Sequence, residues 1–112
     1  MTSRFLTAPD VARIVHAANS ALRAAIWEPV VPLEEYVSNG RFAGVVQGVL
    51  DQLVDPVDDG EASHERWLKS MDAQGVTDHP CQVPYDQLPP AQQAKDELFR
   101  AIVEYLEPYT KY

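Results

Sequence analysis

Three polar side chains follow one flank of a predicted helix near the start of the chain. His16, Asn19 and Arg23 are spaced at i, i+3 and i+7, so they lie beside the apolar stripe of that helix. Trp27 continues the same flank. A polar strip bordered by apolar residues is typical of the wall of a small-molecule cleft. The alternative is a structural role, in which His16 and Asn19 hydrogen-bond to carbonyl groups of a neighbouring loop.

A second pair of ring-bearing residues lies on a predicted helix in the middle of the chain. His64 and Trp67 are three residues apart and therefore share its inner face. Trp67 offers a flat surface on which a planar ligand ring could stack, with His64 donating a hydrogen bond beside it. The alternative places both residues in the core, where Trp67 buries apolar area and His64 satisfies a backbone group.

A third group lies in a proline-rich segment, where four prolines fall within residues 80–90. Proline fixes φ, removes a backbone donor and favours an extended conformation in the preceding residue, so a stiff, extended arm is predicted. His79, Cys81 and Tyr85 belong to this arm. Because alternate residues of an extended chain share a face, we expect Cys81, Val83 and Tyr85 to hold the arm against the helices.

These groups do not match a known type of catalytic or metal site. The chain has three histidines and one cysteine, without the Cys-x-x-Cys or His-x-x-x-His spacing typical of zinc sites. Cys81 as a nucleophile would need a base, and the nearby His79 is held in the same extended arm. No Ser-His-Asp group, phosphate-binding glycine loop or paired-carboxylate site stands out. We therefore predict a non-enzymatic protein with no metal and no other cofactor.

The first of four predicted helices covers about residues 8–26. Thr7 is a good N-cap, Pro9 suits the first turn, and Asp10 follows the cap by three residues. Residues 27–37 contain two prolines and are expected to form a loop anchored on the core by Trp27 and Tyr36.

Three further helices are predicted from the spacing of apolar residues. They are one capped by Ser38 or Asn39 and ending before Pro56, one from near Gly60 to a glycine cap at Gly75, and one over about 90–106. The buried side of the last helix is expected to carry Ala91, Ala94, Leu98, Ile102, Tyr105 and Leu106.

The overall composition limits the class of protein. A chain of 112 residues with 46% apolar and 23% charged residues predicts a single domain over residues 1–112, with its core within about 8–107. A net charge of −8 with scattered basic residues lacks the basic stripe of nucleic-acid binders. No apolar run approaches a membrane span of about 20 residues, and the start of the chain lacks the apolar region of a secretory signal. A single cysteine fits a reducing compartment, so we expect a cytoplasmic protein that binds neither nucleic acid nor membranes.

The arm also resembles a known family. Residues 79–89 read His-Pro-Cys-Gln-Val-Pro-Tyr-Asp-Gln-Leu-Pro and precede a Lys-Asp pair at 95–96. This pattern resembles the signature of the ryanodine-receptor (RyR) domain, a small helical module found as repeats in the calcium-release channel and as stand-alone bacterial and phage proteins. Residues 64–67, His-Glu-Arg-Trp, resemble the family's His-Glu-x-Trp helix. Residues 12–22 and 95–103 resemble its first and last helices, so the similarity covers most of residues 9–106.

The resemblance implies an all-α fold of two pseudo-symmetric helix pairs with a proline-rich extended arm. It also implies a function, because the channel's RyR repeats are similar to a nucleotide-accommodating fold in which tryptophans stack on adenine. A stand-alone member would then sense or sequester an adenine nucleotide or an ADP-ribose-like metabolite. We expect its site between the first helix and the unit formed by the third helix and the arm. The candidate ligand-binding residues are His16, Asn19, Arg23, Trp27, His64, Trp67, His79 and Tyr85.

This chain differs from the family pattern just before the arm. Only residues 74–78 stand where the family usually has Gly-Trp-x-Tyr-Gly and several more residues, so one aromatic pair that could stack on a base is missing. The alternative function is a protein-interaction or self-assembling structural module without a small-molecule ligand. Such a module would use exposed aromatic residues and the arm to bind a partner protein or a second copy of the chain.

Overall fold

The computed structural model describes residues 5–112, and within them the prediction of an all-α fold is confirmed. Residues 1–4, on which part of the expectation about a secretory signal depends, lie outside the described residues. The helices are α1 (Ala8–Ala25), α2 (Leu33–Ser38), α3 (Arg41–Val54), α4 (Gly60–Ala73) and α5 (Pro90–Leu106), with short 3-10 helices η1 (Tyr85–Gln87) and η2 (Glu107–Tyr109).

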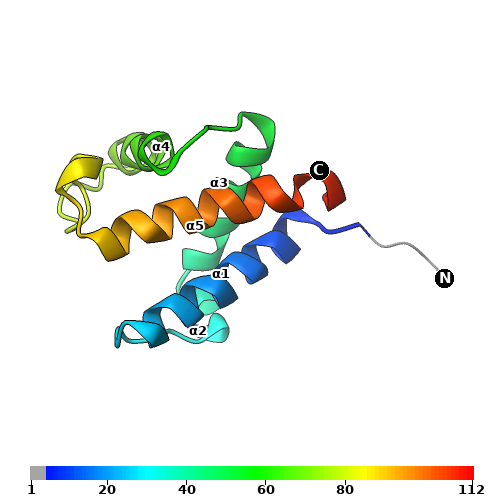
Figure 1. Ribbon diagram of the computed structural model, residues 1–112, viewed down its shortest axis with the longest axis horizontal. Helices are drawn as coiled ribbons and strands as arrows, with labels where there is room; N and C mark the ends of the chain where they lie inside the picture. The colour runs from blue at the N-terminus through cyan, green and yellow to red at the C-terminus, as the bar shows by residue number, and fades with distance from the viewer. Residues whose placement is uncertain (1–4) are drawn as a thin grey trace.

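The central element is α5, which packs against α1, α3 and α4. Figure 1 shows α5 between α4 and α1, with α3 crossing behind it. The two ends of the described chain meet, since the Leu6 amide donates to the Tyr109 carbonyl and the Lys111 amide donates to the Leu6 carbonyl, each at 2.9 Å. The buried apolar core is formed by Ala8, Val11, Ala12, Val15, Val49, Leu53 and Val103.

The local signals for helix ends are confirmed at α1 and α4. Thr7 and Asp10 form a reciprocal capping box at the start of α1, which satisfies two amides that no helix carbonyl reaches. At the end of α4, Gly75 has a φ of 75° and donates to the Asp72 carbonyl, while the Val76 amide donates to the Met71 carbonyl. This pair of bonds is the Schellman motif, which needs a left-handed residue and therefore favours glycine.

The number of helices differs from the prediction. The segment 27–37 was expected to be a loop, but Leu33–Ser38 forms α2, which makes five α-helices in residues 5–112 and not four. Of the two expected anchors, Tyr36 packs on His16 with 4.6 Å between ring centroids. Trp27 does not anchor the segment, because its side chain is 95% exposed. The chain leaves α1 through a left-handed conformation at Trp27, with φ of 63°, and this turn places the indole outside the core.

The buried side of α5 also differs from the prediction. Ala94 is exposed and Tyr105 is 76% exposed, whereas Lys95 and Val103 are buried. Because α5 contacts three helices, its buried surface extends beyond one apolar stripe. The ammonium of Lys95 is accommodated by a 2.6 Å ion pair with Glu28, consistent with the rule that buried charges are paired.

The proline-rich arm (residues 78–89) is less buried than its alternating pattern suggests. Cys81, Val83 and Tyr85 are each half-buried, and only Leu88 is fully buried. The short helix η1 also interrupts the extended conformation at residues 85–87. The arm is therefore fastened to the helices mainly by Leu88 and by hydrogen bonds, rather than by a continuous apolar face.

Candidate functional site

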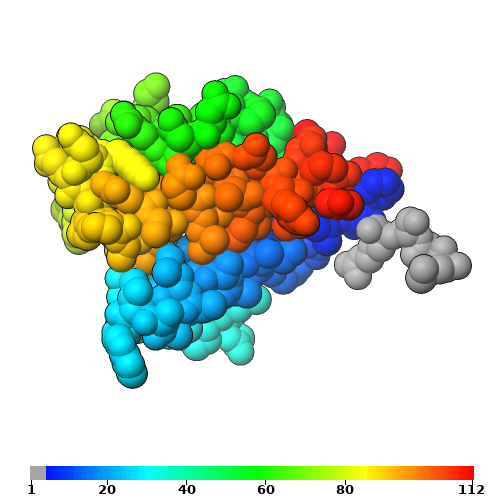
Figure 2. All heavy atoms as spheres, in the orientation of Figure 1, coloured from blue at the N-terminus to red at the C-terminus, as the bar shows by residue number. Residues whose placement is uncertain are grey.

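The eight candidate residues do not form one cleft. Because α5 lies between α1 and α4, it separates candidates on α1 from those on α4 and the arm (Figure 1). Figure 2 shows the same order on the molecular surface, with α5 in orange between α4 in green and α1 in blue. His16, Asn19 and Arg23 line one cavity. His64, Trp67, His79 and Tyr85 form a separate group of rings, and Trp27 belongs to neither.

The first group lines the α1–α2 cavity, a hollow of about 30 Å³ at the contact of α1, α2 and α3. The helical spacing read from the sequence places His16, Asn19 and Arg23 along its α1 wall. The opposite walls come from the segment leading into α2, from α2 itself and from α3. The complete lining is Val15, His16, Asn19, Ser20, Arg23, Val31, Tyr36 and Val45.

Asn19 carries the unusual feature of the α1–α2 cavity. Its Oδ1 atom is buried, and no donor from residues 5–112 lies within hydrogen-bond distance of it. Buried side-chain oxygens are nearly always hydrogen-bonded, because an unpaired one costs about 1–3 kcal/mol. The structural alternative, in which Asn19 bonds to a loop carbonyl, does not provide a partner for this oxygen. A ligand donor at this point would supply one.

One cationic group, Arg23, and two rings, His16 and Tyr36, line the cavity together with this oxygen. Arg23 is held at the cavity by a 3.3 Å bond from Nη1 to the Pro29 carbonyl. The Tyr36 ring lies between His16, at 4.6 Å between centroids, and Arg41, whose Cζ is 5.8 Å from the Tyr36 centroid. The cavity therefore combines a hydrogen-bond acceptor, aromatic surfaces and positive charge.

The size of the α1–α2 cavity sets a limit on what it encloses. Its volume of about 30 Å³ suits one or two water-sized groups. Pockets that enclose a drug-sized ligand measure about 300–1,000 Å³. The cavity can therefore enclose one polar group of a ligand but not a complete ring system.

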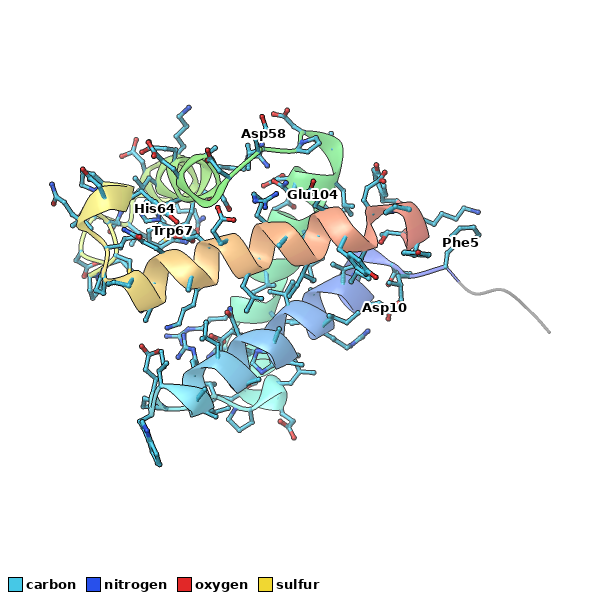
Figure 3. All side chains as sticks on the ribbon, viewed as in Figure 1. Phe5, Asp10, Asp58, His64, Trp67 and Glu104 are labelled. Carbon is cyan, nitrogen blue, oxygen red and sulfur yellow. The ribbon has the colours of Figure 1, made fainter. Side chains whose placement is uncertain are left out.

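The second group, the His64 cluster, consists of His64, Trp67, His79 and Tyr85. His64 is 2% exposed and stacks on Trp67, with 5.5 Å between centroids and 25° between planes. Tyr85 lies at 6.1 Å from His64, and His79 meets Trp67 edge-on at 5.1 Å. Figure 3 shows His64 and Trp67 enclosed between α4, the arm and α5.

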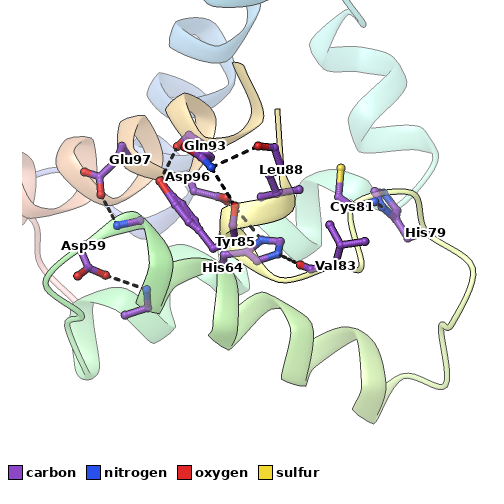
Figure 4. A network of polar contacts seen from close by, with 12 residues as sticks. Asp59, His64, His79, Cys81, Val83, Tyr85, Leu88, Gln93, Asp96 and Glu97 are labelled. Carbon is purple, nitrogen blue, oxygen red and sulfur yellow. Dashed lines mark hydrogen bonds and ion pairs between the residues drawn. The ribbon is translucent and has the colours of Figure 1, made fainter. Parts of the chain in front are cut away.

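Hydrogen bonds to backbone carbonyls hold His64 and Tyr85 in the His64 cluster (Figure 4). His64 Nε2 lies 2.7 Å from the Val83 carbonyl oxygen, to which it donates. The side-chain amide of Gln93 donates to the carbonyls of Tyr85 at 3.0 Å and Leu88 at 3.2 Å, and the Tyr85 hydroxyl donates to the Gln93 carbonyl at 3.4 Å. These bonds match the structural alternative for His64, in which it satisfies a backbone group.

Asp96 is a member of this network that the sequence analysis did not select. Its Oδ2 lies 3.5 Å from His64 Nδ1. Burial raises the pKa of Asp96 to about 6, while the charge of His64 lowers that pKa and the carboxylate of Glu97 raises it. His64 and Asp96 are 32 positions apart, so no local spacing could have paired them.

One ring nitrogen of His79 is occupied by the backbone of the arm. The backbone amide of Cys81 donates to His79 Nδ1 at 3.0 Å, so that nitrogen is occupied and is not available as a base for the thiol. No cluster of three or more histidine, cysteine, aspartate or glutamate residues suited to a metal ion is found within residues 5–112. None of the helices in that range combines the length and apolarity needed to span a bilayer.

Comparisons with known proteins do not assign this chain to a family. No protein-family model, no curated protein and no solved structure matches it.

Proposed function

We propose that this protein is a non-enzymatic, small-ligand-binding module of RyR type that recognises its ligand at the α1–α2 cavity. The observation that carries the proposal is the buried, unpartnered Oδ1 of Asn19 beside His16 and Arg23. An unpaired buried oxygen is costly to the fold, and a ligand that donates to it would offset that cost.

The chemistry of the cavity suits an adenine-containing compound. A carboxamide can accept from the exocyclic amine of adenine and donate to its N7 atom, as asparagine does when it reads adenine in DNA. The rings of His16 and Tyr36 provide surfaces for the base, and Arg23 can pair with a phosphate. The edge of the base would enter the cavity, and the remainder of the ligand would lie outside it, because the cavity is small.

The resemblance of the arm to the RyR domain supports the same ligand class. A cytoplasmic location, a phage or bacterial origin and a pseudo-symmetric arrangement of helix pairs are parts of this proposal. Trp67 is not proposed as the stacking surface, because one of its faces already packs on His64.

Isothermal titration calorimetry with AMP, ATP and ADP-ribose tests the proposal. Wild type should bind at least one of them, and Asn19→Ala and Arg23→Ala should each weaken binding about tenfold or more, equivalent to about 1.4 kcal/mol. Arg13→Ala is the matched control, since Arg13 is also on α1 but pairs with Asp10 away from the cavity. Absence of heat at millimolar ligand for wild type would contradict the ligand class, and equal binding by all four proteins would contradict the site.

A second candidate function is protein interaction, favoured by the exposure of Trp27. Its indole is 95% exposed, and Ile26 and Val30 beside it are 37% and 47% exposed. The turn that carries these residues projects from the surface (light blue, lower left of Figure 2). Exposed tryptophans commonly anchor interfaces. The net charge of −8 disfavours a second copy, so the occupant we propose is a positively charged protein that accepts the indole in an apolar pocket.

The test of this second candidate needs a purified partner. Proteins captured by wild type are compared with those captured by Trp27→Ser and by Val54→Ser, where Val54 is 73% exposed on α3. The captured protein is then purified and titrated directly. Binding that Trp27→Ser alone weakens tenfold or more supports the interaction module, whereas equal binding by all variants contradicts it. A mass that rises with concentration in sedimentation would show self-association instead.

A further inference from the structure

Residues 29–40, which include α2, form a strap across the α1–α2 cavity. Val31 and Tyr36 of the strap line this cavity opposite α1. No residue of the strap is buried, since Val31, Leu33 and Tyr36 are half-buried and the others are exposed. Figure 1 shows α2 beside α1 at the lower edge of the molecule. One wall of the cavity therefore belongs to the surface of the protein and not to its core.

Few contacts hold the strap against α1. The Tyr36 ring packs on His16 with 4.6 Å between centroids, and Arg23 Nη1 donates to the Pro29 carbonyl at 3.3 Å. The backbone bonds of α2 are internal to the strap, as in the bond from the Tyr36 amide to the Pro32 carbonyl, so they survive a movement of the strap as a unit. Segments that bury little apolar surface are the ones that open locally at a low cost in free energy.

The two ends of the strap differ in how firmly they are held. Glu28, just before the strap, is fixed by its carboxylate, which pairs with Lys95 at 2.6 Å, and by its amide, which donates to the Arg23 carbonyl at 2.8 Å. Gly40, at the other end, has a φ of 83°, and a Cβ atom added there would meet no atom within 4 Å. Both backbone angles of a glycine can change at little cost where the space around it is open. Gly40, which leads directly into α3, is therefore the hinge expected for a movement of the strap.

The size of the cavity requires such a movement when a ligand enters. At about 30 Å³ the cavity encloses one polar group, and the strap is the wall that lies at the surface. An outward movement of Val31 and Tyr36 enlarges the cavity. It also uncovers Val15, which lines the same cavity and is only 3% exposed.

We propose that the strap is a lid over the α1–α2 cavity, which opens by rotation at Gly40 and closes on a bound ligand. The closing step rests on the function proposed above, whereas the opening motion does not. Because a guanidinium carries several donors, Arg23 can keep its bond to Pro29 in the closed lid and still pair with a phosphate. Closure excludes water from the ligand's bond to Asn19 Oδ1 and thereby strengthens that bond.

Thiol accessibility tests the opening motion in the ligand-free protein. Val15→Cys and Val103→Cys are made in a Cys81→Ser background, so that each protein has one thiol, and the rate of its reaction with the thiol reagent DTNB is measured. Both valines are buried, but of the two only Val15 lines the cavity. DTNB is larger than the closed cavity, so it reaches position 15 when the lid opens. We expect Val15→Cys to react about 100-fold faster than Val103→Cys, which requires unfolding of the core.

A matched pair of glycine variants tests the hinge. An added Cβ atom meets nothing within 4 Å at Gly40 or at Gly44, but of the two only Gly40 has a positive φ. An alanine at position 40 is strained in the closed lid, and this strain is relieved when φ changes on opening. Gly40→Ala should therefore speed the modification of Val15→Cys about tenfold, whereas Gly44→Ala should leave the rate unchanged.

Three results would overturn the lid. Equal rates for Val15→Cys and Val103→Cys would mean that the cavity opens only when the core unfolds. Equal effects of Gly40→Ala and Gly44→Ala would exclude Gly40 as the hinge. The third is a nucleotide among AMP, ATP and ADP-ribose that binds wild type in calorimetry but does not slow the modification of Val15→Cys at saturation. If none of these nucleotides binds, the proposed ligand is wrong, while the ligand-free rates still decide whether the lid opens.

Discussion

The α1–α2 cavity and the His64 cluster are built from the same kinds of side chain, but their polar atoms are satisfied differently. Each combines a histidine with an aromatic ring and a side-chain amide. In the His64 cluster, His64 donates to a carbonyl of the arm and pairs with Asp96, and the neighbouring Gln93 also donates to arm carbonyls. In the cavity, Asn19 Oδ1 has no protein partner within residues 5–112.

We interpret this difference as one between the structural role of the His64 cluster and the binding role proposed for the α1–α2 cavity. Polar groups that bond to one another stabilise the fold and leave little for a ligand to gain. A buried acceptor without a partner lowers stability, so its presence beside a cavity points to a donor from outside the chain. The only other buried side-chain atom of residues 5–112 without a partner is Arg100 Nε, whose neighbouring nitrogens pair with Glu97 and Glu104.

The largest expected effect tests the structural role of His64. His64→Ala removes a buried ring, leaves the Val83 carbonyl without its donor and leaves Asp96 without its partner. We expect a loss of about 3 kcal/mol in the free energy of unfolding. His79→Ala is the comparison variant, because His79 is exposed and should cost less, about 1 kcal/mol for its hydrogen bond from the Cys81 amide. Urea unfolding at pH 6 measures both, and similar losses would show that the cluster does not depend on His64.

The next effect concerns the attachment of the arm. Leu88→Ala removes the one fully buried apolar side chain of residues 78–89, which is 5% exposed. We expect a loss of about 2 kcal/mol, at the low end for leucine, because the arm can partly close the space. Val54→Ala, at an exposed position, should change stability by less than about 0.5 kcal/mol. If thermal unfolding of Leu88→Ala matches wild type, the arm is peripheral to the fold.

A much smaller effect is expected in the α1–α2 cavity. Asn19→Ala removes a buried oxygen that has no donor among the described residues, so the free energy of unfolding should not fall and should rise by about 1 kcal/mol. The effects of Asn19→Ala and His64→Ala on stability compare the α1–α2 cavity with the His64 cluster most directly. A loss above about 1.5 kcal/mol in urea unfolding would mean that Asn19 is satisfied in solution and has a structural role.

The smallest effect is a pH trend in the stability contributed by the ion pair between Glu28 and Lys95. The hydrogen bond from Lys95 lowers the pKa of Glu28 below its ordinary value of 4.5. A lowered carboxyl pKa stabilises the fold above the unfolded value and ceases to do so as the pH falls through the lowered pKa. Glu28→Gln should therefore melt slightly below wild type at pH 7 and at the same temperature as wild type near pH 3. A difference in melting temperature between Glu28→Gln and wild type that grows on acidification would contradict a stabilising ion pair between Glu28 and Lys95.

The sequence by itself determined the features that depend on neighbours along the chain. The capping box of Thr7 and Asp10 and the glycine cap at Gly75 are local interactions, so they marked helix ends correctly. Residues on one helix keep their relative positions in any fold, and for this reason His16, Asn19 and Arg23 were correctly grouped. The arm was located by its prolines, which restrict the chain wherever it lies.

Only the tertiary structure decided which of these features meet. The position of α5 between α1 and α4 divided the expected cleft in two and buried Lys95, which is not part of the apolar stripe predicted for this helix. It also brought Asp96 to His64 across 32 positions of sequence. The turn after α1 left Trp27 in solvent although its hydrophobicity predicted burial. Hydropathy and spacing describe one element at a time, whereas burial and pairing depend on the surfaces that neighbouring elements cover.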